Sequence, residues 1–146
     1  MTVPSDLTVR DADPADAGWI AALLSEEGYP SGASDLARRL DRFVELGSVV
    51  RVAERDGIAL GFIACHVLPR LERDDPIIRI IALAVDTGAR GRGVGAVLLA
   101  EAERVAREAG AAFVEVTAGH HRAEARRLFE HAGFDAGLTT YLRKRL

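Results

Sequence analysis

The chain has 146 residues, of which 49% are hydrophobic and 28% charged, and this length predicts a single domain over residues 1–146 with a full hydrophobic core. Its net charge of −3 argues against a nucleic-acid partner, because contacts with phosphates need a basic face. It contains no run of 18 apolar residues and no basic leader followed by an apolar stretch, so we expect no membrane span, no signal peptide and a cytoplasmic location.

Alternating or continuous apolar runs predict strands, whereas apolar residues spaced by three and four predict helices. In chain order, the expected elements are a strand over 7–10, helices over 13–28 and 34–47, hairpin strands over 49–54 and 58–68, a buried strand over 77–85, a helix over 94–109, a strand over 112–117, a helix over 122–132 and a strand over 139–146. The order β-α-α-β-β-β-α-β-α-β predicts an α/β (α+β) fold with a mixed central sheet.

Local signals set several of these boundaries. An aspartate cap followed by proline, Asp13 and Pro14, starts the first helix, and Ser34 is the expected cap of the second. The turn Asp56-Gly57 between two apolar runs is typical of a tight hairpin. The last strand is expected at an edge of the sheet, because three consecutive basic residues near its end discourage further pairing.

A turn rich in glycine and arginine joins the buried strand over 77–85 to the helix over 94–109. Its glycines leave backbone N–H groups accessible at the start of the helix, where the helix dipole favours negative charge. Arg90 and Arg92 add two cations. The turn therefore predicts a site for a phosphate or pyrophosphate.

Two nucleotide motifs compete for residues 88–96. The glycine spacing of a P-loop is present, but Val94 and Gly95 stand where that loop needs lysine and a hydroxyl. Residues 91–96 match a relaxed dinucleotide fingerprint, with Glu115 about 20 residues later as an acid for the ribose. That fingerprint, however, requires its first glycine directly after the strand, and the remaining chain is too short for the second half of its fold.

Two further motifs occur at a matching spacing along the chain. The first is Leu83-Ala84-Val85 followed by Arg90-Gly91-Arg92-Gly93-Val94-Gly95-Ala96, a strand and then Arg-x-x-Gly-x-Gly at the start of a helix. The second is residues 122–134, which begin Arg-x-x-Ala and end Leu-Phe-x-x-x-Gly-Phe. Together they resemble the GNAT superfamily of N-acetyltransferases, strongly over residues 77–135 and in element order from 7 to 68. The resemblance implies a single GNAT-like domain.

The resemblance implies transfer of an acetyl group from acetyl-CoA to a primary amine of a small molecule or peptide by direct attack. The strand backbone would pair with the peptide-like pantetheine arm, the N–H groups of the turn would hold the pyrophosphate, and two later side chains would add contacts. These implied cofactor contacts are Leu83, Ala84, Val85, Arg90, Gly91, Arg92, Gly93, Val94, Gly95, Ala96, Arg122 and Phe129. Arg122, where many relatives carry asparagine, is equally compatible with a surface arginine.

Catalysis needs a base for the incoming ammonium and, optionally, an acid for the leaving thiolate. Many relatives supply that acid from a tyrosine where this chain has Phe129, which lacks a hydroxyl, so water, the thiolate itself or another group such as Tyr141 must serve. Glu115 occupies a strand position where some relatives place a catalytic glutamate. A structural ion pair explains Glu115 equally well, and an aromatic residue on an edge strand also explains Tyr141.

The histidines and the single cysteine predict no metal site. His120 and His121 lie in a loop without the spacing of a metal motif, and Cys65 and His66 face opposite sides of a strand. The apolar run around Cys65 predicts an inert buried thiol.

Two other functions stay open from the sequence. A CoA-binding module with little or no turnover is motivated by Phe129, and a nicotinamide-dinucleotide-binding enzyme by the relaxed fingerprint. Acceptor selection is expected from the two N-terminal helices and the Tyr29-Pro30 loop, because family members vary there. Homodimers are common among relatives, and only the resemblance suggests one here.

Overall fold

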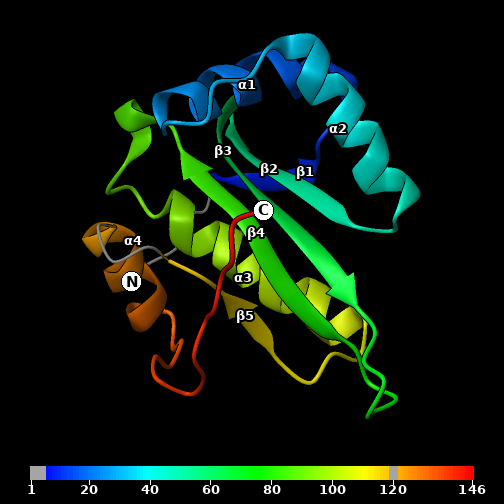
Figure 1. Cartoon of the computed structure of the whole chain (residues 1–146). Coiled ribbons are helices and arrows are strands. Elements are labelled where there is room, and N and C mark those ends of the chain that lie inside the picture. The colour runs from blue at the N-terminus through cyan, green and yellow to red at the C-terminus, as the bar shows by residue number, and fades with distance from the viewer. Residues whose placement is uncertain (1–5, 119–121) are drawn as a thin grey trace.

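The computed structural model describes residues 6–118 and 122–146, which form one mixed sheet with helices on both faces (Figure 1). The strands lie in the spatial order β1 (Thr8–Asp11), β2 (Val49–Arg55), β3 (Ile58–Leu68), β4 (Ile77–Val85) and β5 (Val114–Val116). Neighbours from β1 to β4 are antiparallel, and β4 and β5 are parallel. This arrangement confirms the predicted mixed sheet.

The helices form two layers that cover opposite faces of the sheet. Helices α1 (Ala17–Glu26) and α2 (Ala33–Glu45) lie on one face, and α3 (Val94–Glu108) lies on the other with α4 (Ala123–His131) beside it (Figure 1). Two short 3-10 turns, η1 (Pro14–Asp16) and η2 (Thr87–Ala89), precede α1 and follow β4. No helix within residues 6–118 and 122–146 combines the length and apolarity needed to cross a membrane.

Strand alternation divides the hydrophobic core into two clusters. Val52 and Phe62 point toward α1 and α2, whereas their neighbours Ala53 and Ile63 point toward α3. Cys65 lies in the α3 cluster, and burial raises the pKa of its thiol to about 12. The thiol therefore stays protonated at neutral pH, as the apolar sequence around it predicted.

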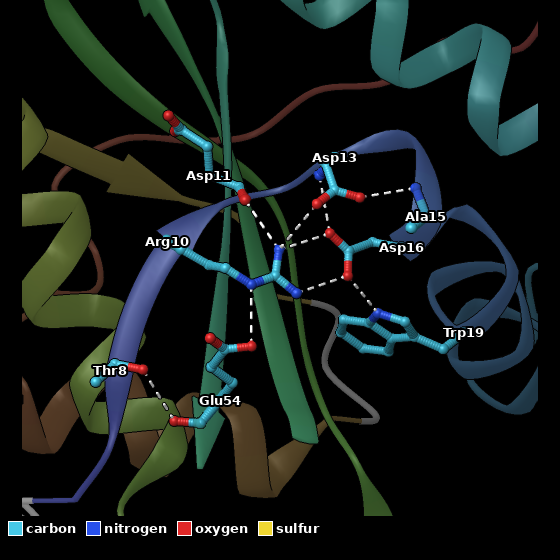
Figure 2. Close-up of polar contacts among 8 residues, drawn as sticks. All are labelled: Thr8, Arg10, Asp11, Asp13, Ala15, Asp16, Trp19 and Glu54. Carbon is cyan, nitrogen blue, oxygen red and sulfur yellow. Dashed lines mark hydrogen bonds and ion pairs between the residues drawn. The ribbon is translucent and has the colours of Figure 1, made fainter. Parts of the chain in front are cut away.

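A polar network fixes the start of α1 against β1 and β2 (Figure 2). Arg10 on β1 donates to both carboxylate oxygens of buried Asp16, at 2.8 and 2.9 Å, and its Nε donates to Glu54 on β2 at 3.0 Å. Asp16 also accepts from the backbone N–H of Asp13 and from the indole of Trp19. These hydrogen bonds, that from Arg10 foremost, lower the pKa of Asp16 to about 2 although burial opposes them.

The last predicted strand and the predicted cap of α2 were wrong. Residues 139–146 form no strand, and all their side chains are exposed. Tyr141 and Leu142 are adjacent, so a strand would point them to opposite faces, and the basic residues that follow leave no apolar face to bury. The cap of α2 is Gly32 in extended conformation, not Ser34. A glycine cap is tolerated there, and Asp35 in the first turn complements the helix dipole.

Replacing Asp16→Asn tests the polar network. We expect a loss of about 2 kcal/mol in the free energy of unfolding at pH 7, because the buried carboxylate that pairs with Arg10 is removed. The folded pKa lies below the unfolded value of 3.8, so the stabilisation is complete above about pH 4 and disappears as the pH falls toward about 2. Urea unfolding across this pH range measures the difference between the two proteins.

The exposed carboxylate of Asp41 on α2 provides the control. Asp41→Asn should leave the free energy of unfolding within about 0.5 kcal/mol of wild type. A gap between wild type and Asp16→Asn that stays constant from pH 4 to pH 2 would contradict the assignment.

Candidate functional site

The carboxyl-terminal half of β4 has one paired edge and one open edge. Its pairing with β3 continues to Val85, opposite Gly61, with an irregularity at Ile81, which has no partner on β3. Among the described residues, β5 follows β4 only from Ile78 to Ile80. Leu83, Ala84 and Val85 therefore lie in a stretch whose backbone faces no strand on the β5 side.

The turn after β4 brings the start of α3 to this open edge. The backbone N–H of Asp86 donates to Leu60 O at 2.8 Å, which fixes the beginning of the turn on β3. Gly91 and Gly93 have φ values of 76° and 83°, in the left-handed region that favours glycine. Gly93 is the N-cap of α3, and no side chain from the described part of the chain caps its first turn.

The first N–H groups of α3 therefore have no helical partner, as at any helix start. They belong to Val94, Gly95 and Ala96, and the positive end of the helix dipole lies with them. Arg92 is exposed in the same turn. The structure thus confirms that the strand, the turn and the helix start are adjacent, an arrangement whose chemistry suits an anion.

Two glycines allow close packing around this turn. A Cβ atom on Gly61 would lie 2.9 Å from Ala84 O and 3.1 Å from Val94 Cγ1, so the missing side chain lets α3 approach the sheet. A Cβ atom on Gly95 would lie 2.9 Å from Leu128 Cδ2 of α4. Gly95 therefore has a packing role between α3 and α4, whatever ligand its N–H group meets.

One carboxylate links the turn to two other parts of the chain. Glu27, directly after α1, accepts from Arg90 Nη2 at 2.7 Å and lies 3.3 Å from Arg122 Nη1. Arg122 also approaches the Glu27 backbone oxygen at 3.3 Å and the Tyr29 hydroxyl at 3.4 Å, and its guanidinium lies 5.6 Å from the centre of the Tyr29 ring. No local sequence pattern marks Glu27, so it was not among the predicted site residues.

The two predicted proton-transfer residues have other partners. Arg79 Nε donates to Glu115 at 2.7 Å, and these residues face each other across β4 and β5. Leu83 is four residues farther along β4, about 13 Å at the usual rise of a strand. Tyr141 is 60% exposed and accepts from Arg143 at 3.2 Å. The geometry therefore gives both residues a second explanation, and their catalytic roles stay predictions.

Phe129 is a core residue. It is 8% exposed and packs in the α3 cluster, with its ring centre 5.6 Å from that of Phe134. Gly133 ends α4 in the left-handed region, with a φ of 91°, and Phe134 then folds back onto Phe129, a contact common after a glycine cap.

The predicted histidine pair cannot be placed. His120 and His121 lie outside the described residues. Within the parts of the chain that are described, no three histidine, cysteine, aspartate or glutamate side chains gather as metal ligands would.

The sequence model of the acetyltransferase (GNAT) family matches residues 17–134. The chain belongs to this family. The matched range includes α1 and α2, the sheet from β2 onward, the glycine-rich turn and α4. The acetyltransferase is therefore an enzyme of the family that its two sequence motifs resembled.

Individual relatives agree with this assignment. The aminoalkylphosphonate N-acetyltransferase of Salmonella typhimurium is 36% identical over 127 residues, which are 87% of this acetyltransferase and 80% of that protein. An uncharacterized N-acetyltransferase of Bacillus subtilis, YhfO, is 30% identical over 92% of this chain and 95% of its own. A Trypanosoma brucei acetyltransferase of known structure shares the fold, with a TM-score of 0.80 at 24% identity over 97% of this chain and 100% of that one.

The contact between Gly95 and Leu128 gives a prediction about packing in this acetyltransferase. We expect Gly95→Val to lower the free energy of unfolding by about 1–3 kcal/mol, because the branched side chain overpacks the space between α3 and α4. Leu128→Ala should suppress part of that loss in the double variant, since it removes the atoms that clash. Thermal unfolding of the wild type, both single variants and the double variant measures the coupling. Strict additivity would count against the contact.

Proposed function

We propose that this acetyltransferase transfers the acetyl group of acetyl-CoA to a primary amine of a small molecule or peptide, within one domain spanning residues 1–146. The observation that carries the proposal is the open edge of β4 beside the uncapped start of α3. Both features recognise a ligand through backbone groups, and they suit two different parts of one elongated cofactor.

The residues present fit acetyl-CoA in their donor chemistry. The open backbone at Leu83, Ala84 and Val85 offers N–H and C=O groups to an arm that contains amides. The N–H groups of residues 94–96 suit a pyrophosphate, and Arg90 and Arg92 supply charge. Acetyl-CoA, when bound, supplies the acetyl group as a thioester.

The proposed proton transfers fall to Glu115 and Tyr141. A base must take a proton from the acceptor ammonium before its nitrogen can attack, and Glu115 is the proposed base. Phe129 cannot protonate the leaving sulfur, so Tyr141 is the proposed acid, with water as the alternative. The similarity to an aminoalkylphosphonate N-acetyltransferase supports small amines as the first acceptors to examine.

Cofactor binding is tested by isothermal titration with CoA, acetyl-CoA and NAD. We expect heat of binding with CoA and with acetyl-CoA, and none with NAD. Arg92→Ala should weaken CoA binding about tenfold or more, because hydrogen bonds to charged groups contribute about 1.5–3 kcal/mol. Arg42→Ala, an exposed arginine on α2, is the matched control and should bind like wild type. Heat with NAD alone would refute the proposal.

Turnover is tested by thiol release from acetyl-CoA over aminoalkylphosphonates, polyamines, aminoglycosides, amino acids and peptides. We expect Glu115→Gln to lower kcat about a hundredfold, as loss of a general base does, without changing the Kd for CoA. Arg79→Gln is the control for the ion pair. If Glu115→Gln and Arg79→Gln lower kcat and the melting temperature equally, then Glu115 acts only through its ion pair with Arg79. If none of the acceptors in the panel gives thiol release, a CoA-binding module would be favoured.

A further inference from the structure

Glu27 neutralises part of the positive charge that the site presents. Its carboxylate contacts two guanidinium groups, those of Arg90 and Arg122, so the three side chains carry a net charge of one unit instead of two. All three side chains are partly exposed: Glu27 by 21%, Arg90 by 47% and Arg122 by 33%. Ion pairs with this exposure contribute little stability, so a stronger anion can replace the carboxylate.

A phosphate group would be such an anion. Arg90 lies three residues before Gly93, the N-cap of α3, and the first N–H groups and the dipole of this helix already favour negative charge. Glu27 is the C-cap of α1, and the dipole at that end of a helix does not favour a carboxylate. A guanidinium has five N–H donors and often binds phosphate through two of them, which favours exchange of one carboxylate oxygen for phosphate oxygens.

We infer that Glu27 competes with the phosphates of the cofactor for Arg90 and Arg122, and that cofactor binding releases the connection between α1 and α2. The inference rests on the proposed function, since it assumes a phosphate-bearing cofactor at the turn. Glu27 and Tyr29 both lie in this connection, and Arg122 at the start of α4 contacts both. Exchange of the Glu27 carboxylate leaves Tyr29 as the remaining side-chain contact of Arg122 in that segment.

Release of this connection also affects the affinity for the cofactor. Thermodynamic linkage is reciprocal. If binding of the cofactor loosens the connection, then a substitution that loosens the connection raises the affinity for the cofactor. Glu27 is therefore a positioning residue. It ties the segment between α1 and α2 to the turn until the cofactor arrives.

The test compares Glu27→Gln with Glu26→Gln, which removes the exposed neighbouring carboxylate at the end of α1. The glutamine keeps the shape and removes the charge. We expect Glu27→Gln to bind CoA about fivefold more tightly than wild type, because the substitution removes one nearby negative charge at a partly exposed position. The affinity of Glu26→Gln should match wild type. Pantetheine, which lacks phosphates, should bind wild type and Glu27→Gln alike.

The outcomes separate this inference from the proposed function. CoA binding to wild type with equal or weaker binding to Glu27→Gln would overturn the inference and leave the proposed function intact. Tighter binding of pantetheine by Glu27→Gln would also overturn it, because the effect would not depend on phosphate. No CoA binding by any of the three proteins would remove the proposed function and the inference together.

Hydrogen exchange measures the release of the connection directly. Without CoA, the amides of Gly28, Tyr29 and Ser31 should exchange faster in Glu27→Gln than in Glu26→Gln. Addition of CoA should accelerate their exchange in wild type and Glu26→Gln but not further in Glu27→Gln. Identical exchange in all three proteins, with and without CoA, would overturn the coupling.

Discussion

The open edge of β4 is the constraint on which the candidate site depends. A buried strand must find partners for its N–H and C=O groups, and β4 finds them on the β3 side as far as Val85. On the other side its pairing with β5 ends at Ile80, next to the irregular position Ile81. The backbone of residues 83–85 thus faces no strand on this side, beside the turn that leads into α3. Under the proposed function, the cofactor would be recognised there chiefly by main chain, which side-chain substitutions change only indirectly.

Glycine positions the turn relative to that edge. Gly61 lies on β3, not in the turn, yet the space above it lets Val94 approach the sheet. Gly93 provides the left-handed N-cap from which α3 starts. The direction of the first N–H groups therefore depends on residues from two separate elements.

Sequence predicted what local patterns determine. The bounds of β4, the start of α3, the capping by Asp13 and the contact between Phe129 and Phe134 all follow from periodicity or from signals within a few residues. Glu27 was missed because its partners are 63 and 95 residues away, and no local signal places a carboxylate between two distant arginines. The strand predicted over 139–146 was wrong, because basic and β-forming residues mark an edge strand only where a partner offers a face to cover.

The division of the core into two clusters has a consequence for how the enzyme can diversify. The layer formed by α1 and α2 packs on residues such as Val52 and Phe62, whereas the turn and α3 pack on Ala53 and Ile63 from the same strands. Substitutions in the two layers share few side-chain contacts, so their effects on stability should be nearly additive. Selection can then alter the layer of α1 and α2 while the layer of α3 keeps its geometry. One scaffold can thus tolerate extensive change on one face of its sheet without disturbing the other.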